Sequence, residues 1–136
     1  MKLATENTEA TEKYKNYLES SLTEKIIQSA IEVHKVLGVG FLENVYESAL
    51  LKELSQKNLK YESQKLIEIF YKGEKVGEHR IDLIVEGKVI VELKSVKSFE
   101  DIHRAQLISY LNATKIRLGL LINFGKSKID VDRIII

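Results

Sequence analysis

Residues 80–94 read Arg-Ile-Asp-Leu-Ile-Val-Glu-Gly-Lys-Val-Ile-Val-Glu-Leu-Lys. Apolar residues alternate along both halves of this stretch, and residues 86–88 between them are polar or glycine, which predicts two antiparallel strands joined by a tight turn. In the first strand the alternation predicts one face made of Ile81, Leu83 and Val85 and another made of Arg80, Asp82 and Ile84. The hairpin is the stretch from which the fold and the chemistry are both inferred.

The length of the turn decides which side chains meet. A three-residue loop, with Gly87 or Lys88 in the left-handed conformation, pairs Val85 with Val89. Counting outward from that pair sets Asp82 opposite Glu92 on the same face. A two-residue loop would send Glu92 to the other face, because a shift of one residue inverts a strand.

Two carboxylates opposed on a sheet destabilise it unless water or a cation lies between them. Mg²⁺ and Mn²⁺ prefer such oxygen ligands. Lys94 follows Glu92 on the same face, where its ammonium group could orient a water molecule or stabilise charge on a phosphate. Alternating charges on a strand are more often its solvated face, so the hairpin alone leaves both interpretations open.

The rest of the chain predicts helices and strands in the order α-α-β-β-β-α-β-β. Thr23 is the expected N-cap of the first helix, which Gly38 and Gly40 end, and Asn58 is expected in the left-handed conformation after the second. The order predicts an α/β layer fold with a mixed sheet flanked by helices. The expected ranges are 23–37 and 42–56 for the helices, about 60–71, 76–85 and 89–96 for the strands, 99–111 for the last helix, and then strands at 118–123 and 129–136, the last at an edge.

Polar side chains on the helices extend the candidate site. Glu43 and Glu47 fall within or beside the apolar stripe of the second helix, where a carboxylate needs a partner. His103, Gln106 and Tyr110 recur at i, i+3 and i+7 on the last helix, an arrangement suited to holding a phosphate or a metal-bound water. The alternative for these three is a helix border that faces solvent.

Composition limits the class of protein. The 136 residues fit one domain, and 44% hydrophobic with 30% charged residues supports a core with a polar surface. The formal net charge of +1 excludes a strongly basic DNA binder, and the lack of cysteine excludes disulfides and thiol chemistry. No apolar run suits a membrane span or a signal peptide, so a cytoplasmic protein is expected. Residues 1–22 are expected to be a polar extension, frayed or helical, before a domain at 23–136.

Several blocks, taken together over residues 23–136, resemble the PD-(D/E)XK nuclease superfamily and, within it, the GxxExxY proteins. The resemblance implies a restriction-endonuclease-like fold. Ile81 stands where the superfamily name has proline, a position that tolerates apolar residues. The matching blocks are Gly40–Tyr46, Tyr71–Gly73, Arg80–Leu83, Val89–Lys94, His103–Leu107 and Gly119–Phe124.

The resemblance also implies roles for individual residues. Asp82 and Glu92 would bind Mg²⁺ together with the Leu93 carbonyl, and Lys94 would position or polarise the attacking water. A helix carboxylate would complete the set, with Glu47 the better match and Glu43 the second.

Further residues would contact the substrate. Gln106 and Tyr110 resemble the Gln-x-x-x-Tyr motif of RecB-like nucleases. Arg80 is expected to contact a phosphate or to brace Asp82. His103 shares the stripe of Gln106 and Tyr110 and is assigned to substrate binding with them.

The expected function is that of a metal-dependent nuclease, a hydrolase of phosphodiester bonds in nucleic acid, with DNA favoured. The alternative is a catalytically silent nucleic-acid-binding or interaction module on the same fold. A third, weaker alternative is an oligomerisation domain, suggested by the apolar residues 134–136. At a net charge of +1, affinity for nucleic acid must come from a homodimer, another partner or a local basic patch. The patch expected from the sequence is Lys94, Lys97, Arg104, Lys115 and Arg117.

Overall fold

The computed structural model describes residues 2–4 and 18–136, and these form one mixed six-stranded sheet with helices on both faces. The strand order is β1-β6-β5-β4-β3-β2, in which β4 and β5 are parallel and the other neighbours antiparallel. The elements are β1 (Lys2–Ala4), α2 (Ser20–Leu37), α3 (Glu43–Gln56), β2 (Tyr61–Tyr71), β3 (Glu74–Val85), β4 (Val89–Lys94), α4 (Asp101–Thr114), β5 (Leu118–Asn123) and β6 (Asp130–Ile135).

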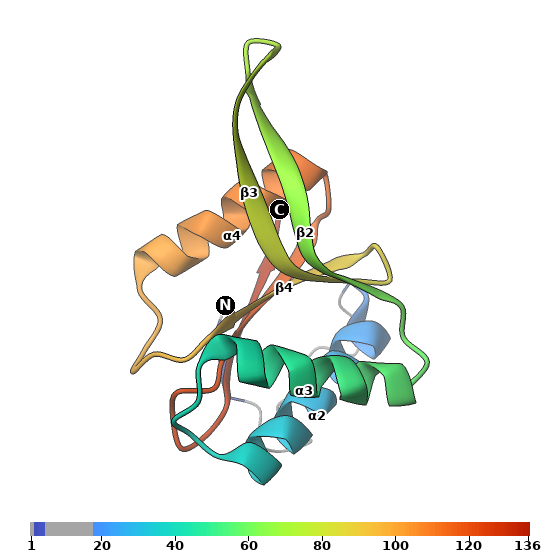
Figure 1. The fold of residues 1–136 in the computed structure, drawn as a ribbon, viewed down its shortest axis with the longest axis vertical. Helices are drawn as coiled ribbons and strands as arrows, with labels where there is room; N and C mark the ends of the chain where they lie inside the picture. Colours follow the sequence, from blue (N-terminus) through green and yellow to red (C-terminus); the bar gives the residue numbers. More distant parts are fainter. Residues whose placement is uncertain (1, 5–17) are drawn as a thin grey trace.

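Two hydrophobic cores lie on opposite faces of the sheet. Helices α2 and α3 cover one face, where Ile26, Leu50 and Tyr46 pack on Val91 and Leu120. Helix α4 covers the other face, where its apolar side chains pack on those of β3, β4 and β5. Figure 1 shows α4 beside the long β2–β3 hairpin and α2 and α3 on the far side of the sheet. The predicted restriction-endonuclease-like α/β fold is confirmed.

The turn of the acid-bearing hairpin has the predicted register. Val85 pairs with Val89, and the ladder runs through Leu83 and Val91. The residues in the left-handed conformation are Glu86 and Gly87, with φ of 55° and 65°, so the Gly87 alternative is right and the Lys88 alternative is wrong.

The predicted alternation of β3 fails at Asp82. Leu83 belongs to the core under α2 and α3, whereas Ile81 belongs with Ile84 to the core under α4. Gln64, which stands between the paired residues Ser63 and Lys65 of the neighbouring strand, has a φ of 53°. The hairpin therefore bends where Asp82 lies. Ile81 was assigned to the wrong face because alternation assumes a straight strand.

The first helix begins earlier than predicted. It starts at Ser20, and the Thr23 hydroxyl donates to the Ser20 carbonyl within the first turn, so Thr23 is not the N-cap. Thr23 also accepts a hydrogen bond from the buried Arg133 (3.0 Å), and this contact accounts for its burial. The ends after Leu37 and at Asn58, whose φ is 58°, agree with the prediction.

Two predictions about the chain ends need correction. Lys2–Ala4 is a strand rather than a frayed or helical segment, and it pairs with Asp130–Asp132. Strand β6 therefore lies between β5 and β1, so it is not an edge strand. The rest of the predicted extension, residues 5–17, lies outside the described residues.

Ile134 packs on the core under α4, and Ile135 and Ile136 are about half exposed. Across the described ranges, none of the helices combines the length and apolar character that crossing a membrane requires.

A buried asparagine fixes the segment that follows β4. Asn123 is fully buried; its Oδ1 accepts from the Val96 and Gly125 amides (3.0 and 2.9 Å) and its Nδ2 donates to the Val96 carbonyl (2.9 Å). A Cβ at Gly125 would lie 2.5 Å from the Val96 nitrogen and oxygen, so only glycine allows this approach. The contact holds the carboxyl ends of β4 and β5 together.

We expect Asn123→Ala to lower the free energy of unfolding by about 1–3 kcal/mol, because it leaves buried backbone groups unpaired. The exposed Asn112→Ala on α4 should stay close to wild type in the same urea titrations. Equal midpoints for the two variants would contradict this account of the Asn123 contact.

Candidate metal centre

The loop before α3 is shaped by a buried tyrosine. The Tyr46 hydroxyl donates to the Gly38 carbonyl (2.6 Å) and accepts from the Phe41 amide (3.3 Å). Its ring stacks on Phe124 at 4.5 Å between centroids. Gly40 has a φ of 111°, a conformation that side chains strongly disfavour. Tyr46 thus holds the loop against the core through both its hydroxyl and its ring.

This loop also sets α3 beside the end of β4. The Ser95 hydroxyl, just after β4, donates to the Phe41 carbonyl (3.2 Å). Glu43 is the first residue of α3 and is exposed, a position where a carboxylate stabilises the helix dipole. Glu47 lies one turn later and is partly buried.

Asp82 and Glu92 lie together where the bend interrupts the ladder. The Asp82 amide donates to Glu92 Oε1 (3.1 Å), and the Leu93 amide donates to Asp82 Oδ2 (2.9 Å). Each carboxylate therefore bonds to the backbone of the opposite strand. The structure thus brings the two predicted acids together across the hairpin.

Glu92 is an acid enclosed in the core, with 5% of its surface exposed. Burial first and the charge of Asp82 second raise the pKa of Glu92 from the usual 4.5 to about 9, although the hydrogen bond from the Asp82 amide and the charge of Lys94 act in the opposite direction. A carboxyl in this position needs either a proton or a cation.

A third acid approaches from the facing helix. Glu47 Oε1 accepts a hydrogen bond from Gln64 Nε2 (2.8 Å). Burial raises the pKa of Glu47, the bond from Gln64 lowers it, and the charge of Asp82 raises it again, with a net increase. The structure thus brings Glu47 into electrostatic contact with Asp82, whereas Glu43 stands exposed at the helix start.

The donors suit a hard divalent cation, although they are not assembled around one. In the described part of the chain, no three His, Asp or Glu side chains are close enough together to hold a metal ion as they stand. Glu47, whose Oε1 is bonded to Gln64, would have to move closer to Asp82 and Glu92 to share a cation with them. The oxygen-only donor set and the enclosed Glu92 carboxyl fit Mg²⁺ or Mn²⁺, whose charge would stabilise the ionised acids.

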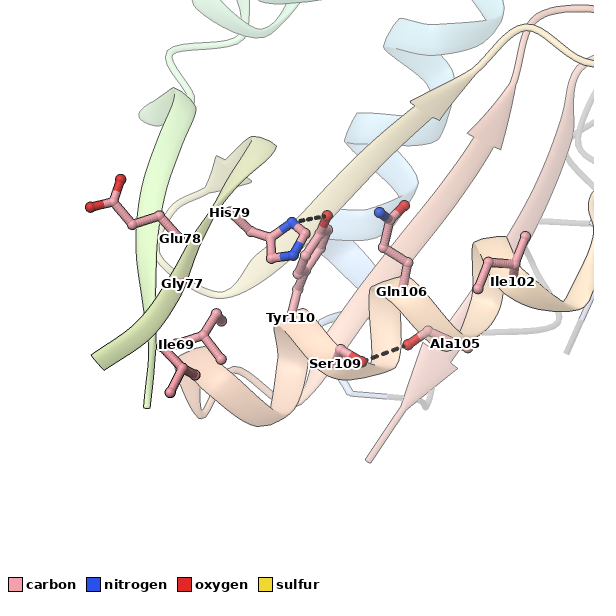
Figure 2. A pocket seen from close by; sticks show the side chains of 10 residues that line it. Ile69, Gly77, Glu78, His79, Ile102, Ala105, Gln106, Ser109 and Tyr110 are labelled. Atoms are coloured by element: carbon pink, nitrogen blue, oxygen red, sulfur yellow. Dashed lines mark hydrogen bonds between the residues drawn. The ribbon is translucent and has the colours of Figure 1, made fainter. Parts of the chain in front are cut away.

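Residues of α4 border the acid pair. The pKa of Tyr110 is raised by burial first, then by the charge of Glu92 and then by that of Asp82. Both carboxylates therefore act electrostatically on its hydroxyl. His79 Nδ1 lies 3.5 Å from this hydroxyl, and the two rings are 5.6 Å apart. Figure 2 shows the Gln106 amide and the Tyr110 hydroxyl on the same side of α4, one turn apart.

Two of the predicted substrate contacts have other partners. His103 forms the capping box of α4 with Glu100, whose amide donates to His103 Nδ1 (3.0 Å). Arg80 Nη1 lies 3.4 Å from the Gln64 carbonyl and makes no bond to Asp82, so the structure shows it bracing the bent strand.

The predicted basic patch is divided between two ends of the molecule. Lys94 ends β4 and Arg117 precedes β5; because these strands are parallel, the two residues lie at opposite ends of the sheet. Lys97 precedes and Lys115 follows the fourteen-residue α4, whose length is about 20 Å. Arg104 is ion-paired with the buried Asp132 (2.6 Å).

Sequence reasoning did not single out Gln64 or His79. Gln64 holds Glu47 and carries the left-handed bend, and His79 borders Tyr110. A glutamine in a strand gives no sign of a positive φ. His79 meets α4 only because the hairpin bends.

Comparison with known families agrees with this geometry. The family model of the PD-(D/E)XK nuclease superfamily matches residues 20–134. The chain belongs to the PD-(D/E)XK nuclease superfamily. This PD-(D/E)XK chain is also similar to the crystal structure of SSO0001, with a TM-score of 0.54 and 20% sequence identity over 92% of this chain and 60% of that one. At that identity the likeness shows the fold, and the chain spans 60% of the length of SSO0001. No curated protein matches it.

For the metal-free protein, we expect the free energy of unfolding to fall as pH rises from about 4.5 toward 9. In that window folded Glu92, with a pKa raised to about 9, keeps a proton that the unfolded chain has released. Glu92→Gln, which cannot ionise, should remove this fall. Urea titrations in EDTA between pH 5 and 8 test the slope, and parallel pH profiles for wild type and variant would contradict the enclosed acid.

Proposed function

We propose that this chain is a metal-dependent nuclease that hydrolyses phosphodiester bonds, with DNA the favoured substrate. The observation that carries the proposal is the enclosed Glu92 carboxyl opposite Asp82, beside Lys94 at the end of β4. Two acids in this position destabilise the fold at neutral pH, and a function that requires a divalent cation accounts for their presence.

Each residue then has a defined task. Asp82 and Glu92 would hold Mg²⁺ or Mn²⁺, with Glu47 as the third carboxylate. When bound, the cation would lower the pKa of a coordinated water and offset charge on the scissile phosphate. Lys94, whose ammonium already interacts with Glu92, would orient that water or stabilise the phosphate charge. Gln106 and Tyr110 would contact the substrate from α4.

Within the superfamily, we assign the chain to the GxxExxY proteins with the Gln-x-x-x-Tyr motif of RecB-like nucleases. The loop supports the first assignment, since Gly40 takes a conformation disfavoured for other residues and Tyr46 closes the loop. Gln106 and Tyr110 support the second, because they lie one turn apart on the same side of α4 and both carboxylates act electrostatically on Tyr110.

One observation favours the alternative of a catalytically silent binding module. The predicted basic groove is divided, and the net charge of the chain is only +1, so the electrostatic affinity expected of a stand-alone nuclease has no single surface. Cleavage assays separate the two functions.

With Mg²⁺ or Mn²⁺, wild type should cut labelled DNA, and Asp82→Asn and Lys94→Met should each be slower by about 10²–10³-fold, the usual effect of removing one electrostatic stabiliser. Asn keeps the acceptor for the Leu93 amide, so the fold should survive. The exposed Lys52→Met on α3 is the matched control. A wild type that cuts nothing with either metal, or variants that cut as fast, would refute the enzymatic proposal.

A matched pair on one helix tests the third ligand. Bound Mg²⁺ stabilises the folded state by mass action, so Mg²⁺ should raise the Tm of wild type and of Glu43→Gln alike, and that of Glu47→Gln less. Thermal unfolding over a Mg²⁺ series measures this. If Glu43→Gln lost the Mg²⁺ effect and Glu47→Gln kept it, the assignment of the helix ligand would be reversed.

A further inference from the structure

A pocket of about 510 Å³ lies between the β2–β3 hairpin and α4. Ile69 and Val76 line it from the hairpin, and Ile102 and Ala105 line it from the helix. Tyr110 forms part of its wall, as Figure 2 shows, and the same side chain faces Asp82 and Glu92. A molecule in the pocket would therefore lie one side chain away from the candidate metal centre.

The lining is apolar, with a few polar groups at one end. Val76 and Ile102 are 62% and 67% exposed, unusual for large apolar side chains next to a pocket that nothing in the described chain fills. The Gln106 amide makes no hydrogen bond to the described residues, so its donor and acceptor are free for a ligand. The exposed His79 ring lies against Tyr110.

The charges of the lining disfavour a phosphate as the occupant. No lysine or arginine lines the pocket in the part of the chain that the structure describes. Its one ionic residue, Glu78, is ion-paired with Lys75 and is directed away from the pocket in Figure 2. A ligand with flat apolar faces and a polar edge fits this lining, and a nucleobase has that chemistry.

We propose that this pocket receives one unstacked nucleobase of a single-stranded nucleic acid whose backbone passes the Asp82–Glu92 pair. The inference rests on the proposed nuclease function, because that function places a phosphodiester at the acids and the adjoining nucleoside next to Tyr110. A base within a duplex is stacked and paired, and entering the pocket would cost it both interactions. The protein should therefore select single strands over duplexes.

Two variants are designed to fill the pocket from opposite walls. Gly77 lines the pocket on the hairpin side, a Cβ there meets no atom within 4 Å, and its φ is not in the left-handed region, so Gly77→Leu is expected to fit the fold and to reduce the pocket volume. Ala105→Phe fills it from the helix. Ile108→Phe adds a ring to α4 outside the lining and is the control. Thermal unfolding checks each fold, and either filling variant alone suffices for the test.

Binding is measured in EDTA by fluorescence anisotropy, with a labelled DNA strand alone and annealed to its complement. Wild type should bind the single strand about tenfold more tightly than the duplex, and each filling variant should lose about tenfold on the single strand while Ile108→Phe loses none, as expected for one stacked base. Equal affinity for the two DNA forms, or filling variants that bind like wild type, would overturn the inference. Because no cleavage is required, this result is independent of the nuclease assay: a wild type that cuts nothing while the filling variants lose binding would remove the nuclease and keep the base pocket.

Discussion

The site depends on the exchange of hydrogen bonds between two carboxylates and two strands. Asp82 reaches the backbone of β4 and Glu92 reaches that of β3, where the bend in β3 interrupts the regular ladder. Because of the bend, the part of the β2–β3 hairpin nearest its turn lies beside α4. The hydrogen bonds hold Asp82 and Glu92 together where the pairing of β3 with β4 is interrupted. The same arrangement encloses Glu92 between the cores, which raises its pKa. Fold and candidate chemistry thus have a common origin in one local distortion.

Much of the fold could be predicted because its signals are local. The polar loop at 86–88 determined the register of the central hairpin, and the glycines after Leu37 and the asparagine at 58 determined helix ends. The predictions that were wrong depend on contacts between distant parts of the chain, which the alternation of apolar residues does not reveal. Thr23 is buried by Arg133, far along the chain, and β6 is covered by Lys2–Ala4 from the other end of the described residues. Ile81 changes face at a bend that coincides with the left-handed conformation of Gln64 on the neighbouring strand.

The candidate site shows the same division. The proximity of Asp82 and Glu92 is predicted by counting along one hairpin, and in the structure each carboxylate bonds to the backbone of the opposite strand. Glu47 could be preferred over Glu43 only through family resemblance, whereas the structure shows it beside Gln64 and Asp82. The prediction of one basic patch is wrong because residues assigned to it flank the two opposite ends of α4 and are therefore far apart in space. His79 could not be predicted as part of the site, because its position depends on a bend that no single residue in the sequence indicates.

The parallel pairing of β4 with β5 has a consequence for the order in which the site forms. The acid-bearing hairpin closes a three-residue loop, and such hairpins form in about 1–10 μs. The parallel pair needs a crossover through α4, so it closes a longer loop and is expected later. Asp82 and Glu92 should therefore become neighbours while still exposed to water, and α4, which carries Tyr110, should pack against them afterwards. With this order of events, solvent would screen the repulsion between the two acids before the core encloses them.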